Sequence, residues 1–203
     1  MQWAAFLSFL LGACYTPGPN IILAMNTARV FGYKKAVPLM SGMTCGLLAV
    51  MTIGAFSNIV IASVIPQILP WVRVAGCGYM LWFAWKIGTS RAPNENGTGA
   101  EMKVPKFADG FVLQFLNPKV IIFGFSAMSI FIAPWTNSKT VYLLAVLFIT
   151  FNCSLAFNLW AVFGHFQGKL LPKYGRAISI TMALILAWYA ISLSGLLTLL
   201  KIS

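Results

Sequence analysis

Six long apolar segments constrain the fold of this chain more than any other feature of its sequence. They span residues 3–28, 36–65, 68–87, 111–133, 140–166 and 177–200. Each reaches or exceeds the roughly 20 residues that an α-helix needs to cross about 30 Å of hydrocarbon. β-barrel strands would be about ten residues long and would alternate polar and apolar side chains. Because lipid offers no partner to an unpaired backbone group, each segment is expected to be helical. The sequence thus predicts an all-α integral membrane protein with six transmembrane helices.

The low content of charged residues supports this fold class. Only 8% of the residues are charged and 60% are apolar, whereas soluble domains carry about 25% charged residues. A soluble chain of this size needs more polar surface, which excludes a water-soluble enzyme, a disordered chain and a disulfide scaffold. The net charge of +11 does not indicate nucleic-acid binding. The basic residues lie between apolar segments, as expected from the positive-inside bias of membrane proteins.

The distribution of Lys and Arg predicts the orientation. Ten basic residues lie at the end of the first, third and fifth segments or in the loops after them, namely Arg29, Lys34, Lys35, Lys86, Arg91, Lys103, Lys106, Lys169, Lys173 and Arg176. Three lie on the opposite side, namely Arg73, Lys139 and Lys201. By the positive-inside rule, the loops that hold the ten basic residues are predicted to be cytoplasmic and both termini to lie outside.

The same segments divide the chain into two halves. We predict a first three-helix repeat over residues 1–88, a cytoplasmic linker over 89–106 and a second three-helix repeat over 107–203. Because each half has an odd number of spans, related halves would be inverted repeats, which is a common plan among transporters.

Proline-containing breaks interrupt the first and fourth segments. The first break is the run Thr16, Pro17, Gly18, Pro19 and Asn20. Its prolines lack a backbone N–H and disfavour helix in the preceding residue, and glycine tolerates backbone angles that other residues avoid. We expect the helix to stop near Tyr15 and to restart at Pro19 or just after it, since proline is favoured at the first helical position.

The second break contains Asn117, Pro118 and Lys119. Asparagine is a strong N-cap and proline suits the next position. Each restarted half-helix would present free N–H groups and a partial positive charge. Because the breaks occupy equivalent segments of the two halves, they indicate a binding site near the midplane of the membrane.

Lys119 adds a full positive charge to the second break. A lysine at this depth costs on the order of 3 kcal/mol, so it either serves function in a cavity or snorkels to an interface. Two helix starts and a cation together predict a site for a carboxylate. Five amides would add hydrogen bonds there or between helices: Asn20, Asn26, Gln114, Asn152 and Asn158. The predicted substrate-binding residues are Thr16, Pro17, Gly18, Pro19, Asn20, Gln114, Asn117, Pro118 and Lys119.

Other residues with chemical potential are few. The cysteines, Cys14, Cys45, Cys77 and Cys153, lie far apart in apolar segments, and we interpret them as small buried residues rather than disulfides or metal ligands. His165, the single histidine, is an interfacial residue or a proton relay. Three acidic residues and one histidine are too few for an enzyme active site, and the sequence has no nucleotide-binding motif. We expect no catalysis, no cofactor and no metal.

These motifs resemble those of the LysE/RhtB superfamily of bacterial amino acid exporters. The resemblance covers essentially the whole chain and rests on residues 16–20, the spacing Gly42-x-x-x-Gly46, residues 84–86 and residues 115–119. Residues 82–90 and 113–117 are most similar to the cysteine and O-acetylserine exporter branch. The resemblance implies a secondary transporter of the bacterial inner membrane that exports small neutral amino acids and is coupled to the proton motive force. A homo-oligomer is compatible with it. The glycine spacing itself is typical of close helix packing.

Proton coupling has few candidate residues. Proton-coupled carriers usually place Asp or Glu within the membrane, but here the acid nearest a span is Asp109, at the cytoplasmic edge of the fourth segment. The candidates are therefore Asp109 and Lys119, or the charge state of the substrate itself. A small-solute channel and a non-catalytic membrane scaffold are the alternative functions. Saturable, gradient-driven flux distinguishes a carrier from a channel.

Overall fold

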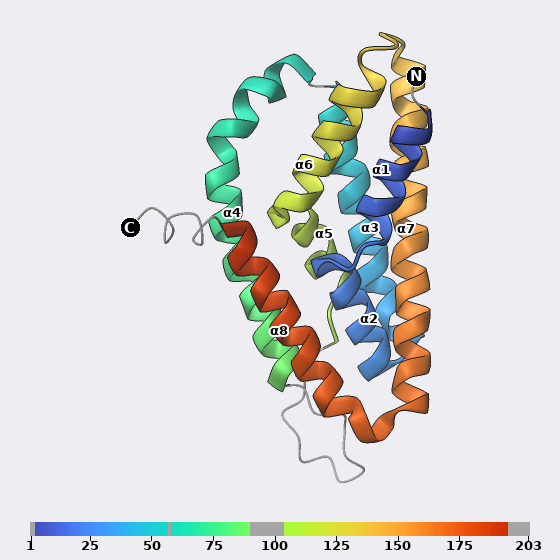
Figure 1. Cartoon of the computed structure of the whole chain (residues 1–203), viewed down its shortest axis with the longest axis vertical. Helices are drawn as coiled ribbons and strands as arrows, with labels where there is room; N and C mark the ends of the chain where they lie inside the picture. Colours follow the sequence, from blue (N-terminus) through green and yellow to red (C-terminus); the bar gives the residue numbers. More distant parts are fainter. Residues whose placement is uncertain (1–2, 57, 90–103, 195–203) are drawn as a thin grey trace.

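The computed structural model describes residues 3–56, 58–89 and 104–194 of the chain. In these ranges the chain forms helices joined by short connections, and Figure 1 shows most of them along the long axis of one bundle. The helices are α1 (Trp3–Tyr15), α2 (Pro19–Phe31), α3 (Tyr33–Phe56), α4 (Asn58–Thr89), α5 (Phe107–Leu116), α6 (Pro118–Ser126), α7 (Lys139–Leu170) and α8 (Gly175–Ser194). A π-helical turn over Ala127–Ile132 follows α6, and a 3-10 turn over Pro172–Tyr174 precedes α8. Most of the predicted linker, with Glu95 and Glu101, lies outside the described residues.

Apolar helices long enough to cross a membrane account for much of the bundle. Three single stretches qualify: Tyr33–Phe56, Lys139–Leu170 and Pro172–Ser192. Two bent pairs also qualify if each counts as one span: α1 with α2, bent by 45°, and α5 with α6 and the π-helical turn, bent by 64°. The described residues thus form an all-helical bundle with three to five candidate spans. The third predicted span, residues 68–87, falls within α4, which is not among these five.

Both proline breaks lie where the sequence predicted them. α1 ends at Tyr15 and α2 begins at Pro19. The second interrupted span divides at Asn117, because α5 ends at Leu116 and α6 begins at Pro118. Proline cannot donate a backbone hydrogen bond and its ring collides with the preceding turn. Each span therefore changes direction partway along its length.

The boundary between the second and third predicted spans differs from the prediction. The expected span over residues 36–65 is divided, since α3 ends at Phe56 and α4 begins at Asn58. Pro66 and Pro70 lie inside α4. Hydropathy alone does not locate a helix boundary when the residues on both sides are apolar, and this is why the prediction placed the end of the second span too late.

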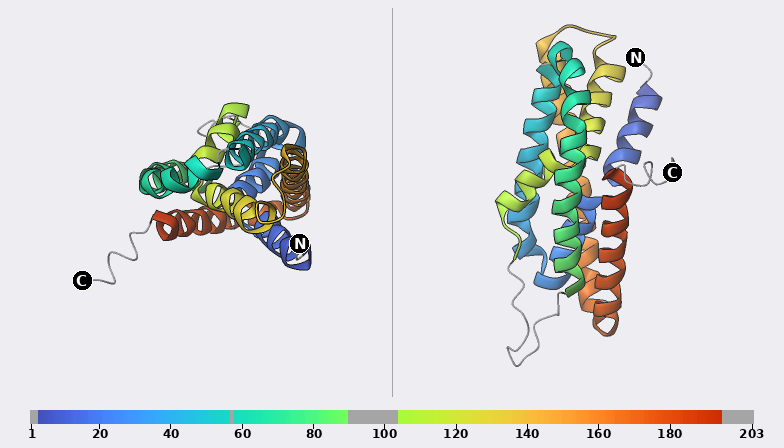
Figure 2. Two further views of the ribbon diagram at one scale, coloured as in Figure 1. Left: turned by 90° about the horizontal axis from the view of Figure 1, so that it is seen from above. Right: turned by 90° about the vertical axis from the view of Figure 1, so that its left-hand side faces the viewer.

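The interrupted spans pack against continuous helices. The most extensive contacts join α3 with α5, α2 with α7 and α4 with α8, and α2 lies inside the bundle in the view from above (Figure 2). Gly42 and Gly46 let α3 approach α5 closely: a Cβ on Gly46 would lie 2.7 Å from the carbonyl oxygen of Phe111, and one on Gly42 would overlap the carbonyl of Phe107. The prediction that this glycine pair serves close helix packing is confirmed.

By contrast, only one side of α1 is packed against the bundle. Its buried residues are Phe6, Leu10 and Cys14, which recur at intervals of four. Leu7 and Leu11 are exposed. Residues four apart lie on one side of a helix, and this stripe faces the bundle where α1 lies beside α7 (Figure 1). The ring of partly buried Phe9 adds contacts with Phe123 and Phe131.

Candidate functional site

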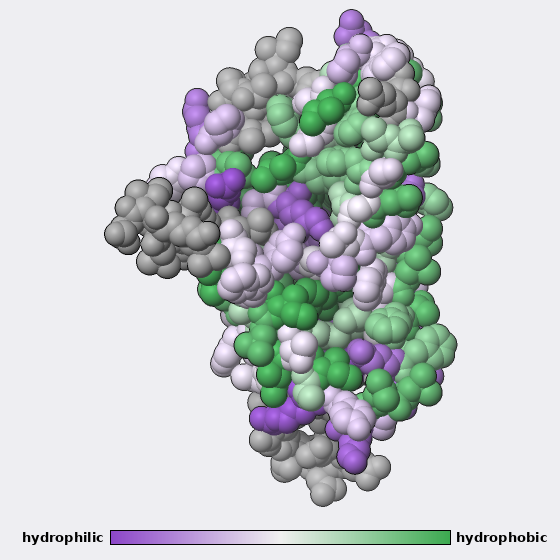
Figure 3. Space-filling view, viewed as in Figure 1, coloured by the Kyte–Doolittle hydropathy of each residue, from purple (hydrophilic) through white to green (hydrophobic). Residues whose placement is uncertain are grey.

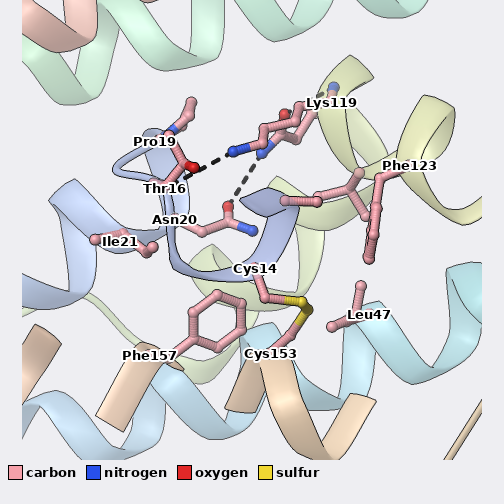
Figure 4. Close-up of a pocket in the computed structure, with 14 residues that line it drawn as sticks. Cys14, Thr16, Pro19, Asn20, Ile21, Leu47, Lys119, Phe123, Cys153 and Phe157 are labelled. Atoms are coloured by element: carbon pink, nitrogen blue, oxygen red, sulfur yellow. Dashed lines mark hydrogen bonds between the residues drawn. A yellow bond between two sulfur atoms is a disulfide. The ribbon is translucent and has the colours of Figure 1, made fainter. Parts of the chain in front are cut away.

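The two helix breaks meet in a small pocket in the middle of the bundle (Figure 4). It is lined by Ala13, Cys14, Thr16, Gly18, Pro19, Asn20, Ile21, Leu47, Asn117, Lys119, Val120, Phe123, Cys153 and Phe157. The cavity volume is about 40 Å³. Since a water molecule needs roughly 10–15 Å³, the pocket has room for a few waters. An amino acid does not fit in this volume.

The first break starts a half-helix that lacks a side-chain cap. Gly18 is the N-cap of α2, and no side chain accepts a hydrogen bond from the first turn. Pro19 has no N–H to offer. The next backbone amides, those of Asn20 and Ile21, are therefore the first donors at this end of α2. They lie beside the pocket, where a partial positive charge favours an anion.

Gly18 serves close approach rather than an unusual backbone angle. Its φ of −141° and ψ of −175° are extended values that any residue adopts, so the expectation of a glycine-specific conformation is wrong. A Cβ at this position would lie 3.2 Å from Nζ of Lys119 and 3.7 Å from its Cδ. The absence of a side chain leaves room for the lysine to lie against the first break.

The second break starts a half-helix whose first turn is largely satisfied. The side-chain oxygen of Asn117 accepts a hydrogen bond from the backbone N–H of Lys119 at 3.1 Å, which confirms the predicted N-cap. The backbone amides of Val120 and Ile121 both donate to the carbonyl oxygen of Asn117. The expectation of two equally open helix starts therefore needs correction, because the cap already uses the donors of α6.

A chain of buried amides joins the two interrupted spans. Asn117 donates to Oδ1 of Asn20 at 3.2 Å, and Asn20 donates to Oε1 of Gln114 at 2.9 Å. Gln114 donates in turn to the carbonyl oxygen of Gly110 at 3.3 Å. All three side-chain amides are buried, with 8% or less of each residue exposed. Loss of one would leave an unpaired buried group, at a cost of about 1–3 kcal/mol. The chain thus fixes the two breaks relative to each other.

Lys119 reaches from the second break toward the first. Its Nζ lies 3.5 Å from the carbonyl oxygen of Thr16, and the side chain crosses the pocket in Figure 4. Among the described residues that line the pocket, Lys119 alone carries a charge. The ammonium group is therefore the dominant electrostatic feature of this cavity.

The pocket collects six of the predicted substrate-binding residues: Thr16, Gly18, Pro19, Asn20, Asn117 and Lys119. Gln114 joins them through the amide chain. Pro17 is exposed and Pro118 is buried, and neither lines the pocket. Asp109 lies apart from the pocket at the start of α5, where its Oδ2 accepts a hydrogen bond from the backbone N–H of Lys106 at 2.7 Å.

The other amides that we considered make contacts elsewhere. Asn152 donates to the carbonyl oxygen of Phe148 at 2.9 Å, within α7. Asn158 accepts a hydrogen bond from the hydroxyl of Tyr33 at 2.6 Å. Asn26 accepts one at 2.8 Å from Arg29, an arginine that also donates to the carbonyl oxygen of Gly175 at 3.0 Å and to the hydroxyl of Ser179. The bond of Asn158 and those of Arg29 to Gly175 and Ser179 connect different helices, whereas those of Asn152 and Asn26 stay within one helix. None of these three asparagines lines the pocket.

Sequence reasoning missed a disulfide in the pocket wall. Cys14 of α1 and Cys153 of α7 form it, with Cα atoms 5.0 Å apart, and Figure 4 shows it on the opposite side of Asn20 from Lys119. The expectation of four unpaired cysteines is therefore wrong, whereas Cys45 and Cys77 are free. The two cysteines are 139 residues apart, so their pairing could not be predicted from the sequence. Only the packing of α1 on α7 brings the two sulfurs together.

The rest of the pocket wall is apolar, and nothing in the sequence marks its residues as part of a binding site. Leu47, Val120, Phe123 and Phe157 resemble any other apolar residue of a membrane span. On the face shown in Figure 3, polar surface gathers in a hollow at mid-height, between apolar regions above and below it. Among the described residues, no group of three or more His, Cys, Asp or Glu side chains is placed to hold a metal ion.

Comparisons with protein families and with individual proteins both relate this chain to membrane exporters. A protein-family model described as LysE type translocator matches residues 11–195. The chain is 36% identical over 194 residues to the cysteine/O-acetylserine efflux protein of Salmonella typhimurium (strain LT2), covering 94% of this chain and 96% of that protein. It is 32% identical over 188 residues to the cysteine/O-acetylserine efflux protein of Escherichia coli (strain K12), covering 93% and 95% of the two chains. No solved structure matches the chain.

Proposed function

Since this chain belongs to the LysE type translocator family, we propose that it is a secondary transporter that exports small neutral amino acids, such as cysteine or O-acetylserine, from the cytoplasm. Its relatives named cysteine/O-acetylserine efflux proteins match it over more than nine tenths of their length. The observation that carries the proposal is Lys119, which lies without a carboxylate beside it in a pocket built from two interrupted helices.

The pocket offers a partner for each end of a zwitterionic amino acid. The substrate carboxylate would accept hydrogen bonds from Nζ of Lys119 and from the backbone amides of Asn20 and Ile21. Charge-assisted hydrogen bonds of this kind are the strong ones. The carbonyl oxygen of Thr16, now 3.5 Å from the lysine, would accept from the substrate ammonium. A short side chain would then lie against the apolar wall near Phe157.

The small volume of the pocket means that the proposed transport requires the bundle to open. A cavity of about 40 Å³ must widen before a substrate binds, and it must do so toward one side of the membrane at a time. The two breaks permit this, because a half-helix can move without its other half. Transporters of inverted-repeat design place their sites at such discontinuous helices.

The wider architecture of the proposal is the one that the sequence predicts. We propose six spans as two inverted three-helix repeats, residues 1–88 and 107–203, joined by a cytoplasmic linker over residues 89–106. The chain is then a multi-pass protein of the bacterial inner membrane with both termini outside. Similar breaks at Pro19 and Pro118 support the repeat, and the distribution of basic residues supports the orientation.

Proton coupling, which family membership suggests, would most directly involve Lys119. Among the described residues, it is the one charged side chain that lines the pocket. Its Nζ would therefore both bind the substrate carboxylate and take up or release the proton. Asp109 is the weaker candidate, because its carboxylate already caps α5 through the backbone N–H of Lys106.

Counterflow in proteoliposomes tests the function. Vesicles that contain the purified protein are loaded with unlabelled O-acetylserine, and uptake of labelled O-acetylserine is measured at increasing external concentration. A carrier gives saturable uptake that the internal substrate accelerates. Uptake that rises linearly and carries an electrical conductance would instead identify a channel. Absence of flux for O-acetylserine, cysteine and other small neutral amino acids would identify a scaffold.

A further inference from the structure

The Cys14–Cys153 disulfide forms part of the pocket wall. Both cysteines line the same pocket as Lys119, and each residue is only 5% exposed. A thiol in bulk solvent therefore has little access to the two sulfurs. A small solute within the widened pocket would lie directly against them.

We propose that this disulfide is a thiol-exchange site, at which a small thiol amino acid in the pocket forms a mixed disulfide with the protein. The thiolate of the solute attacks Sγ of one cysteine, and a new S–S bond forms as the Cys14–Cys153 bond breaks. The other cysteine leaves as a thiolate and takes up the proton that the solute thiol had released. The exchange needs no further oxidant or reductant, and its reversal restores the original bond.

The pocket would select the thiol by size and charge. Lys119 attracts a carboxylate, so a thiol amino acid would be held with its sulfur inside the cavity. A tripeptide thiol such as glutathione needs far more room than a single amino acid, so a pocket that widens from about 40 Å³ to admit one residue still excludes it. This selection rests on the proposed function, because it requires that the pocket opens to small amino acids.

Exchange would also loosen α1. Cys14 is the last buried residue of α1 and lies just before the first break. The end of the helix is held to α7 by the disulfide and by a hydrogen bond from Nε1 of Trp160 to the carbonyl oxygen of Tyr15 at 3.2 Å. Breaking the covalent link leaves this bond, the apolar contacts of Leu10 and the ring contacts of Phe6 and Phe9, all but the first of which lie toward the other end of the helix. The half-helix that bounds the pocket would then move more freely.

Mass spectrometry tests the exchange itself. The protein in lipid nanodiscs is incubated with N-ethylmaleimide to block accessible free thiols, of which exposed Cys45 is the internal standard. It is then treated with L-cysteine, glutathione or L-serine, quenched in acid, alkylated with iodoacetamide and digested. With L-cysteine, we expect one cysteinyl adduct on Cys14 or Cys153 and a new alkylated thiol on its partner. Glutathione should react on the order of ten-fold more slowly, because access limits exchange, and serine should give no adduct.

Two results would overturn the exchange site. One is a Cys14–Cys153 bond that stays intact in L-cysteine, and the other is equal reaction with L-cysteine and glutathione. Finding both cysteines as free thiols in protein alkylated at the moment of cell lysis would refute the disulfide itself. None of these measurements depends on transport.

Flux of O-acetylserine, which has no thiol, tests the loosening of α1. Dithiothreitol is small enough to reach the disulfide when the pocket widens during transport. We expect it to raise the initial counterflow rate of the wild type several-fold, up to the rate of the double variant Cys14→Ser and Cys153→Ser. The double variant should not respond to dithiothreitol, and Cys45→Ser should behave like the wild type. Equal rates in the oxidised wild type, the reduced wild type and the double variant would refute the tether. Loss of counterflow in every protein would refute the proposed function, while the adduct measurement would still decide the exchange.

Discussion

Replacing Lys119 with methionine tests the carboxylate site directly. Methionine has a similar length and suits an apolar wall, so the pocket keeps its volume while it loses its single positive charge. The cap of α6 survives, because Asn117 accepts its hydrogen bond from the backbone of residue 119 rather than from the lysine side chain. The substitution therefore changes the electrostatics of the pocket and little else.

The expected loss of affinity follows from one charge-assisted hydrogen bond. Such a bond contributes about 1.5–3 kcal/mol, and 1.4 kcal/mol corresponds to about a factor of ten in affinity. Binding of O-acetylserine should therefore weaken about ten- to one-hundred-fold. The contact from Nζ to the carbonyl oxygen of Thr16 is 3.5 Å long, so its loss adds little. Removing a charge from within the membrane also favours the fold, so expression should be at least that of the wild type.

The assay compares two ligands on two proteins. Calorimetric titration measures binding of O-acetylserine and of its carboxamide, which lacks the negative charge. The wild type should prefer the carboxylate by about ten-fold or more, and Lys119→Met should lose this preference while it binds the carboxamide as the wild type does. Lys119→Arg keeps the charge with a different shape and should retain the preference. Lys139→Met, at an exposed position, is the matched control. A Lys119→Met protein that still prefers the carboxylate would refute the anion site.

Three further predictions follow from the packing and the charge distribution. Gly18→Ala places a Cβ 3.2 Å from Nζ of the pocket lysine and should raise the KM of counterflow several-fold, whereas Gly12→Ala, with nothing within 4 Å, should not. Gly46→Val forces α3 away from α5 and should destabilise the protein by about 1–3 kcal/mol, seen as a lower Tm in detergent. Gly54→Ala in the same helix meets no atom within 4 Å, and an equal loss there would refute the close-packing argument. A reporter fused to Ser203 should lie outside the cytoplasm, and cytoplasmic activity alone would reverse the predicted orientation.

The two helix breaks could be predicted because their signals are local. Pro19 and Pro118 act on the turn that contains them, and Asn117 caps the helix that begins beside it. The position of a break along the chain follows from such residues without knowledge of the rest of the fold. The same reasoning assigned Gly18 to a special backbone angle, and this was wrong because the reason lies in another span, at Lys119.

Features that depend on packing between distant helices were not predictable. The partner of Cys14 is a residue of α7 that looks like any small side chain of an apolar span. The hydrogen bond between Asn20 and Gln114 likewise needs both interrupted spans to be in place. The length of α4 escaped prediction for a related reason, since Pro66 and Pro70 usually end a helix but are contained in this one.

The length of α7 links the pocket to the thickness of the bilayer. Its 32 residues extend about 48 Å at 1.5 Å per residue, against roughly 30 Å of hydrocarbon. Exposed Lys139 and Lys169 lie near its two ends, so the headgroup regions, which bring the bilayer to about 40–45 Å, accommodate part of the surplus length and tilt accommodates the rest. The tilt changes when the lipid chains become shorter or longer. Because α7 carries Cys153 and Phe157 of the pocket wall, each change of tilt moves that wall relative to the helix breaks. The width of the pocket is therefore expected to depend on the mismatch between the length of α7 and the thickness of the bilayer.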